Sequence, residues 1–444
     1  MKLFYIFIIL ILFENCSFDN KSGIWKDENN ILNDDSNDND LFKEFETLST
    51  SGKSFDKIIP IDNSFKFKKT TLVNNFEWKD VFYAEDNNFI NFKYTNLNEL
   101  IFRSKKTTKY KVNDFILFDK NNLITADLKG NIIVFSVNNN KIVTKFNFYK
   151  KKYKNIKKKL NFIVENNIIY ISDNIGFLYA FDYKQNRILW AKNYKIPFRS
   201  NLKIYENKLI AANQNNNLYF FNKKNGDTLR LIPTEDTTVK NKFINNLSLN
   251  NNSLFFLNTY GSLYSVNLRS MKLKWFTNLN QSLDLNPSNL FLSNQIINNK
   301  GKIVVSSNQF TYVLDSNNGS IIHKKNFSTQ IKPIIMNDIL FLITNNNLII
   351  AMSITSGKII YSYDVNQKIA EYLKLKKNTV KFKNMIIANN KLTIFLKNSY
   401  ILKFNINGNL EEVNRLPSKI NTNPIFIDSS ILYLDFKNKI SIVN

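Results

Sequence analysis

The sequence of 444 residues has a single cysteine, Cys16, and a single histidine, His323. One cysteine excludes an internal disulfide, and one Cys with one His supplies no ligand set for zinc and no credible Cys–His nucleophile. Glycine and proline are scarce, at 10 and 7 residues. The turns "NNGS", "TSGK" and "NGN" are typical of hairpins, and none joins a strand to a helix as a phosphate-binding loop does. Carboxylate pairs for glycoside hydrolysis leave no local signature, and none is predicted. We therefore expect no catalytic residue, no cofactor and no metal.

The N-terminus lacks an apolar run long enough to cross a bilayer. The run from Leu3 to Phe13 has eleven residues, whereas a spanning helix needs about twenty. Its length, with Lys2 before it and Cys16 after it, is typical of a signal-peptide core and resembles a bacterial lipoprotein signal. Phe13 and Asn15 depart from that pattern, which usually has Leu and a small residue there. We predict a lipoprotein signal peptide over 1–15 and lipidation of Cys16, which would anchor the chain in a membrane.

Charge is distributed unevenly along the chain. Residues 16–50 carry nine acidic and three basic side chains, whereas residues 51–444 carry the excess of positive charge, within a total of +25. The acidic stretch "KDENNILNDDSNDND" lacks apolar periodicity, which is typical of disorder. We predict that residues 16–70 form a lipidated, disordered acidic tether.

The densest basic run is "YKKKYKNIKKK", residues 149–159. Three interpretations are open: a solvated loop, a contact with anionic lipid or lipopolysaccharide, and nucleic-acid binding. No aromatic stacking platform or nucleic-acid motif accompanies the run, so nucleic acid is not predicted as a partner. Asn, Lys, Ile and Phe all have A/T-rich codons, and the positive charge is therefore also explicable as a codon bias.

A repeating pattern occupies most of the chain. In "GFLYAFDYKQNRILW" (176–190), two short apolar runs flank five polar residues, which predicts a β-hairpin. Weaker copies follow throughout the chain, and a period near forty with several short strands is typical of a β-propeller with one four-stranded blade per repeat. We call Tyr179 and the residues at the same position of the other copies the anchors. They are Ile133, Tyr179, Tyr219, Tyr264, Tyr312, Ile350, Leu402 and Ser441.

These eight anchors predict an all-β fold, an eight-bladed β-propeller of four-stranded antiparallel blades over residues 71–444. The segment Val81–Arg103, with "DVFYAE", "FINFKY" and "LIFRS", is predicted to complete the last blade. The aromatic residues of the repeat should pack neighbouring blades together. His323 occupies a position held elsewhere by Trp190 and Trp275, and we expect the same packing role for it.

The repeats resemble the PQQ-like consensus x-L-Y-A-L-D-x-x-T-G-x-x-x-W, most closely in "GFLYAFDYKQNRILW" and "GSLYSVNLRSMKLKW". Together with the lipoprotein front, the chain resembles the BamB family over roughly residues 75–444. The resemblance implies a non-catalytic scaffold lipoprotein on the periplasmic face of the outer membrane. It would be a monomeric subunit of the β-barrel assembly machinery, bind the POTRA domains of BamA and other subunits, and assist insertion of β-barrel proteins.

The stretch "IPFRSNL" (196–202) resembles the family segment that carries an exposed arginine. Ile196, Phe198 and Arg199 are therefore the predicted partner-binding residues, since aromatic residues and Arg dominate binding hot spots. An ordinary strand start with a solvated Arg is the other interpretation. The same repeat builds PQQ-dependent dehydrogenases, so the alternative functions are a divergent quinoprotein dehydrogenase and a carbohydrate-binding surface lipoprotein. Asp182 and Asp315 lie at turns, where Asp bonds to the local backbone.

Overall fold

The computed structural model describes residues 17–18, 25–26, 54–236, 244–280, 290–307 and 309–444. The chain divides into two compact units, Met1–Lys53 and Ser54–Asn444. In the first, β1 (Ser17–Phe18) pairs with β2 (Trp25–Lys26) in an antiparallel ladder. The predicted signal peptide and Cys16 lie outside the described residues.

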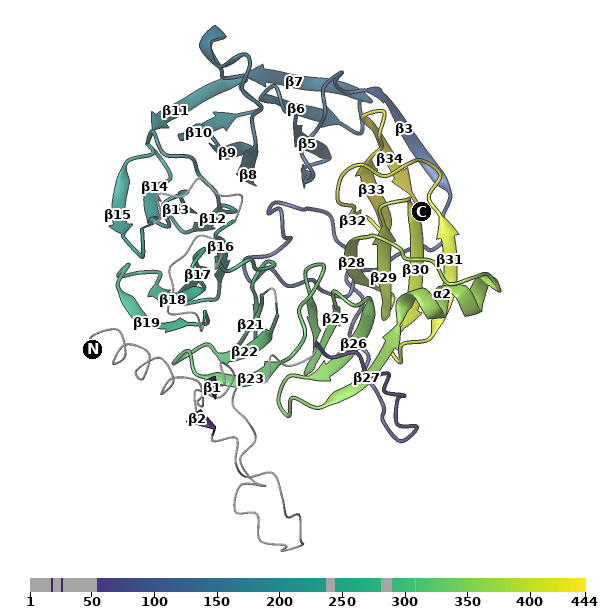
Figure 1. Cartoon of the computed structure of the whole chain (residues 1–444). Helices are drawn as coiled ribbons and strands as arrows, with labels where there is room; N and C mark the ends of the chain where they lie inside the picture. The colour runs from purple at the N-terminus through teal and green to yellow at the C-terminus, as the bar shows by residue number, and fades with distance from the viewer. Residues whose placement is uncertain (1–16, 19–24, 27–53, 237–243, 281–289, 308) are drawn as a thin grey trace, which may run out of the picture. The chain divides into compact units, whose positions relative to one another are not determined.

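The second unit is a ring of four-stranded antiparallel sheets, eight of them in the described residues, which confirms the predicted propeller (Figure 1). Each blade is a meander whose strands run in sequence order from the centre to the rim. From the inside outward, the first four blades are β4 (Leu117–Asp119), β5 (Asn122–Ala126), β6 (Asn131–Ser136), β7 (Lys141–Asn147); β8 (Leu160–Glu165), β9 (Ile168–Asp173), β10 (Phe177–Asp182), β11 (Arg187–Asn193); β12 (Lys203–Tyr205), β13 (Lys208–Ala212), β14 (Leu218–Asn222), β15 (Thr228–Ile232); and β16 (Asn246–Leu249), β17 (Ser253–Leu257), β18 (Ser262–Asn267), β19 (Leu273–Asn278).

The remaining blades continue around the ring in the same way, except that the outermost strand of the last blade comes from the N-terminal side. They are β20 (Ile297–Asn299), β21 (Lys302–Ser306), β22 (Thr311–Asp315), β23 (Ile321–Lys325); β24 (Ile334–Met336), β25 (Ile339–Ile343), β26 (Leu348–Ser353), β27 (Ile359–Asp364); β28 (Phe382–Ala388), β29 (Lys391–Leu396), β30 (Tyr400–Asn405), β31 (Leu410–Arg415); and β32 (Ile425–Ile427), β33 (Ser430–Leu434), β34 (Lys439–Val443), β3 (Leu100–Lys106).

All eight sequence anchors lie in the third strand of their blades, as the repeat predicts. The third and fourth strands form the predicted hairpin, with Tyr179 of β10 opposite Ala191 of β11. Tyr179 and Tyr312 are buried, at 0 % and 2 % exposure, in clusters that join neighbouring blades. The aromatic anchors therefore provide packing between blades.

The tryptophan position of the repeat forms a second contact between blades. Trp190 of the second blade donates from Nε1 to the carbonyl oxygen of Lys223 in the third, at 3.0 Å. Trp275 lies in the same way against Gly319 of the next blade. His323 takes this position in the fifth blade: its ring lies against Gly357, and Nε2 is 3.0 Å from the carbonyl oxygen of Thr355. The predicted packing role of His323 is confirmed.

A matched pair of glycines tests this contact. Gly319 and Gly301 both adopt left-handed backbone conformations (φ +74° and +79°), but a Cβ at Gly319 would lie 2.4 Å from the Trp275 ring, whereas one at Gly301 would come no closer than 3.9 Å to a neighbouring atom. We expect Gly301→Ala to lower the free energy of unfolding by about 1–2 kcal/mol through backbone strain alone. Gly319→Ala should cost about 1 kcal/mol more, because the indole must move. Urea unfolding of both variants measures the difference, and equal losses would contradict the packing role of the tryptophan.

One predicted ring-closing strand is confirmed and two are wrong. The stretch "LIFRS" forms part of β3, which pairs with β34 and closes the last blade. The stretches "DVFYAE" and "FINFKY" instead belong to residues 78–95, here called the channel segment. This segment occupies the centre of the ring, where Figure 1 shows the chain before β3. Apolar runs such as these can fill the centre of the ring as well as form a blade strand. The innermost strands of the blades point apolar side chains toward the centre, where the channel segment packs against them.

The channel segment bonds to all eight blades. The hydrogen-bonded pairs, in blade order, are Trp78 N–Phe118 O, Val164 N–Lys79 O, Lys203 Nζ–Ala84 O, Leu249 N–Glu85 O, Asn298 N–Asp86 O, Ile335 N–Asn88 Oδ1, Phe92 N–Ile387 O and Thr95 N–Ser429 O, with lengths of 2.7–3.0 Å. Its aromatic side chains are largely buried, with Trp78 and Phe92 stacked at 5.6 Å between ring centroids. The segment therefore fills the central channel and ties the blades together.

The propeller unit begins at Ser54, earlier than the predicted start at residue 71. Residues 54–70, assigned from the sequence to the tether, contact the blades: Phe55 N donates to Asn326 O at 2.8 Å, and Thr70 N donates to Asn390 Oδ1 at 2.9 Å. Composition alone did not separate this stretch from the acidic one, since both lack a clear period.

The one α-helix of the described propeller residues, α2 (Val365–Leu373), was not predicted from the sequence. It begins at Asp364, whose carboxylate accepts the backbone N–H groups of Asn366 and Gln367, an N-cap contact. It lies between the sixth and seventh blades, where the anchors Ile350 and Leu402 are farthest apart, so the extra residues of this repeat include the helix. Among the described residues, no helix combines the length and apolar character needed to cross a membrane.

Candidate functional site

The predicted partner segment, residues 196–202, leads from β11 of the second blade into β12 of the third. Its backbone is held on both sides: Arg199 N donates to Ala212 O at 3.0 Å, and Asn245 N donates to Arg199 O at 2.9 Å. Gln214 N also donates to Pro197 O at 2.7 Å. The segment is therefore held firmly, and a side chain exposed on it has little backbone freedom to lose on binding.

Phe198 does not lie on the surface. Its side chain is 1 % exposed and packs edge-on against Tyr194 and Phe221, with ring centroids 5.8 and 6.1 Å apart. It belongs to the hydrophobic cluster between the second and third blades. The surface role predicted for Phe198 does not fit this burial. The sequence motif could not show which side of the segment each side chain occupies.

Ile196 and Arg199 are both partly exposed and remain candidates for contact. Arg199 is partly buried, and this burial lowers the pKa of its guanidinium. Gly176 allows the backbone of Ile196 to approach closely, because a Cβ on Gly176 would lie 2.9 Å from the Ile196 backbone nitrogen. The structure thus retains two of the three predicted residues as surface groups.

The outer edges of the blades offer a second kind of site, and the chain already uses one of them. Ile59 pairs antiparallel with Ser362 on the free side of β27: Ile59 N donates to Ser362 O at 3.0 Å, and Ser362 N donates to Ile59 O at 2.9 Å. Residue 59 has therefore formed a β-bridge to the edge of the sixth blade. Such edges present unpaired backbone groups that accept a further strand.

Other outer strands remain edges and carry exposed apolar side chains. In the described residues, the rim side of β15 and of β19 pairs with no further strand. Leu229 and Leu231 of β15 are 41 % and 42 % exposed, and Phe276 of β19 is 59 % exposed. β15 belongs to the blade that the 196–202 segment enters. We take the segment and this edge of the same blade as the two parts of the candidate partner surface.

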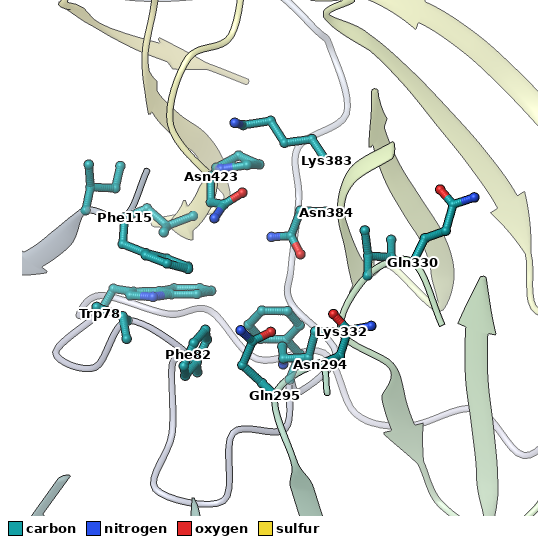
Figure 2. A pocket seen from close by; sticks show the side chains of 16 residues that line it. Trp78, Phe82, Phe115, Asn294, Gln295, Gln330, Lys332, Lys383, Asn384 and Asn423 are labelled. Carbon is teal, nitrogen blue, oxygen red and sulfur yellow. The ribbon is translucent and has the colours of Figure 1, made fainter. Parts of the chain in front are cut away.

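A cavity at one mouth of the central channel had no counterpart among the sequence motifs. It has a volume of about 160 Å³ and is lined by the aromatic rings of Trp78, Phe82 and Phe115 together with amide side chains. Figure 2 shows these rings close together, with Asn384, Asn423 and Lys383 farther along the lining. The Nε1 group of Trp78 is buried without a hydrogen-bond partner among the described residues. A cavity of this size admits a group as large as benzene.

Lys332 also lines this cavity and is 6 % exposed. Its ammonium group donates to the carbonyl oxygen of Asn87 and lies 3.4 Å from the centroid of the Phe89 ring. Burial lowers the pKa of Lys332 to about 7, and the carboxylate of Asp86 opposes this shift only in part. Both partners, Asn87 and Phe89, belong to the channel segment, so the lysine secures that segment in the ring.

The acidic residues weighed as catalytic groups have local roles. Asp182 accepts the backbone N–H groups of Lys184 and Gln185, each at 2.9 Å, and Asp315 accepts that of Asn317 at 2.8 Å. Each carboxylate thus stabilises the hairpin turn that contains it. Across the described residues, no three His, Cys, Asp or Glu side chains gather closely enough to hold a metal ion.

Comparison with known proteins links the chain to one family. The family model described as "Outer membrane protein assembly factor BamB" matches residues 128–363, more than half of the sequence. A comparison with curated proteins found no match.

Among solved structures, the chain is similar to BamB from Moraxella catarrhalis, with 12 % identity, a TM-score of 0.60, and coverage of 78 % of this chain and 99 % of that one. It is also similar to the quinohemoprotein alcohol dehydrogenase of Comamonas testosteroni, with 10 % identity, a TM-score of 0.60, and coverage of 83 % and 80 %. A europium-containing methanol dehydrogenase matches at 11 % identity and a TM-score of 0.59, with coverage of 80 % and 89 %. At these identities the structural matches establish the fold alone, and BamB and dehydrogenases share it.

Proposed function

Because the chain belongs to the family of the outer membrane protein assembly factor BamB, we propose that it is a non-catalytic scaffold of the outer-membrane β-barrel assembly machinery. In this role it binds the POTRA domains of BamA, joins other subunits as a monomer, and assists insertion of β-barrel proteins. Lipidated Cys16 would hold it at the periplasmic face of the outer membrane, and residues up to Lys53 would connect the anchor to the propeller.

The observation that carries this proposal is the β-bridge that the chain already forms at a blade edge. In the Ile59–Ser362 pair, the rim of this propeller accepts one residue of another part of the chain through two backbone hydrogen bonds. β15 offers the same kind of edge, with Leu229 and Leu231 exposed beside it. Backbone pairing with flanking apolar contacts suits a partner that contributes a strand, as a domain with an exposed sheet edge does.

The second component of the proposed interface is the fixed segment before β12. Ile196 supplies apolar area, and the partly buried Arg199 supplies a charged group on a rigid backbone. Hot spots combine such features, because little conformational entropy is lost and the charge is already partly desolvated. Phe198 would support the segment from beneath without contacting the partner.

A quinoprotein dehydrogenase is the second candidate, since two such enzymes share the fold. The channel segment argues against it, because its side chains occupy the centre of the ring, and the cavity that they line there, of about 160 Å³, suits a benzene-sized group rather than a polycyclic cofactor. Reconstitution with PQQ and Ca²⁺ separates the candidates: a bound quinone chromophore or dye-linked dehydrogenase activity would contradict the scaffold proposal.

Affinity purification of the full-length protein from detergent-solubilised outer membranes tests the scaffold role. We expect the central barrel protein of the assembly machinery to be recovered at low salt and at roughly 0.3 M salt, where loose electrostatic adhesion is screened. Arg199→Glu should reduce recovery about tenfold or more, the loss expected for a hot-spot residue. Arg187→Glu, which makes the same charge change at the exposed first residue of β11, should not.

Two results would count against the proposal at different levels. Equal recovery with both variants would remove Arg199 from the interface while leaving the scaffold role in place. Failure of the wild-type protein to recover the barrel protein at the higher salt would overturn the scaffold role itself.

A further inference from the structure

A basic cavity lies between the first and second blades, in the part of the chain that contains the run 149–159. Its volume is about 330 Å³, and five of its lining residues are Lys129, Lys150, Lys151, Lys154 and Lys158. We propose that this cavity, here called the lysine pocket, is a binding site for a phosphate-bearing anion. This site is separate from the partner surface and does not depend on the scaffold role.

The pocket is built by residues fixed in the propeller. Gly130 lies so close to Tyr149 that a Cβ on it would be 2.4 Å from the ring, and the absence of a side chain lets this aromatic wall approach. The Tyr149 hydroxyl donates to Asp173 Oδ2 of the second blade at 2.5 Å. The short 3₁₀ helix η1 (Lys151–Tyr153) forms the rim. Loop residues that would otherwise move freely are therefore held against two blades.

Hydrogen bonds to carbonyl oxygens hold two lysines at the pocket, and neither forms an ion pair with an acidic side chain of the described residues. Lys158 is 1 % exposed, donates to the carbonyl oxygen of Tyr153, and lies 5.1 Å from the centroid of the Tyr149 ring. Lys129 donates to the carbonyl oxygen of Lys154 at 3.3 Å. Burial and the nearby charge of Lys129 lower the pKa of Lys158. A buried ammonium bonded only to a neutral carbonyl is costly, and an incoming anion would relieve that cost.

The nearest carboxylates do not neutralise the pocket directly. Asp127 and Asp173 are fully buried, and their oxygens are occupied by internal donors, including Thr108 for Asp127 and Tyr149 for Asp173. Their negative charges partly reduce the positive potential at Lys158. In the part of the chain that the structure describes, none of the five lysines has a carboxylate within the 4 Å of an ion pair. The exposed ammonium groups of Lys150, Lys151 and Lys154 are therefore available to a ligand.

The number of cations favours phosphate over a single carboxylate. A phosphoryl group offers several acceptor oxygens and up to two negative charges, and lysine binds phosphate as a point charge from several directions. The cavity is also larger than one phosphate needs, which leaves room for an attached glycerol or sugar. Both a lipid headgroup and a free phosphorylated compound have this chemistry.

The test uses the full chain carrying Cys16→Ser, so that no acyl group tethers it to lipid. Calorimetric titration with glycerol 3-phosphate at roughly 0.15 M salt measures the free ligand, and co-flotation with vesicles of phosphatidylglycerol in phosphatidylcholine measures the headgroup. The pocket variant is Lys150→Gln/Lys151→Gln/Lys154→Gln. The control, Lys66→Gln/Lys68→Gln/Lys69→Gln, removes the same charge from three exposed lysines elsewhere on the propeller unit.

We expect saturable glycerol 3-phosphate binding that the pocket variant weakens at least tenfold and the control leaves unchanged. Flotation lost only in the pocket variant would assign the ligand to a lipid headgroup, and titration binding without flotation would assign it to a free compound. Absence of saturable binding, or equal loss in both triple variants, would overturn the proposal. Tighter binding of a single-stranded oligonucleotide with the same dependence on these lysines would also overturn it, in favour of nucleic acid.

Discussion

Lys203→Ala is expected to lower the free energy of unfolding of the propeller by about 3–5 kcal/mol, the cost of breaking a buried ion pair from one side. The Lys203 side chain has no solvent exposure, and its ammonium lies 2.7 Å from Asp80 Oδ2 of the channel segment, whose side chain is 8 % exposed. It also donates to the carbonyl oxygen of Ala84 at 2.9 Å. Removing it leaves the carboxylate of Asp80 buried without a cation.

A double-mutant cycle separates this cost from ordinary loss of packing. Lys203→Ala with Asp80→Asn removes both charges, and Asp80→Asn keeps the Oδ1 atom that accepts the backbone N–H of Phe82 at 2.8 Å. We expect the double variant to regain a large part of the stability lost in Lys203→Ala, because neither charge is then stranded. Guanidinium unfolding of the wild type, the two single variants and the double variant gives the coupling energy. A loss below about 1 kcal/mol in Lys203→Ala, the value typical of an exposed pair, would contradict the structural role of the pair.

Trp78→Ala should be destabilising by about 3–5 kcal/mol, as is usual when a large aromatic residue is removed from a core. Trp78 is 2 % exposed and packs against Phe89 and Phe92 inside the ring, with centroids 5.7 and 5.6 Å away. The cavity already present beside it adds to the empty space, so the site should collapse only in part. Thermal unfolding followed by near-UV circular dichroism reports both stability and the loss of aromatic packing.

Phe76→Ala is the matched control, because Phe76 lies two residues earlier in the chain and is 60 % exposed. Its substitution should change stability by no more than about 0.5 kcal/mol. If the two variants prove equally stable, the channel segment is not part of the cooperative unit, and its bonds to the eight blades contribute little.

Both predictions follow from the way the N-terminal part of the propeller unit closes the ring. β3 completes the last blade by pairing with β34, and the channel segment bonds to all eight blades. Blades in an open array would contact only their neighbours. A central segment that contacts all of them links distant blades directly, and we infer that it raises the cooperativity of unfolding.

The repeat was readable from the sequence because its spacing and chemistry are local. An apolar run, a polar turn and a second run specify a hairpin wherever they occur, so the repeat alone places all eight anchors in their strands. The tryptophan position is equally clear, and the place of His323 in the pattern correctly predicts its packing role. The single cysteine and histidine limit the chemistry in the same direct way.

Only the tertiary structure decided what depends on contacts between distant residues. Phe198 is buried because side chains of the third blade cover it, and no pattern within "IPFRSNL" encodes that covering. The runs around Trp78 and Phe92 looked like blade strands, because a strand and a channel-filling segment both need apolar residues. Asp80 and Lys203 are 123 residues apart, and the lysine pocket needs two blades to hold one loop. Local sequence determines which elements form; burial and pairing depend on which of them meet when the ring closes.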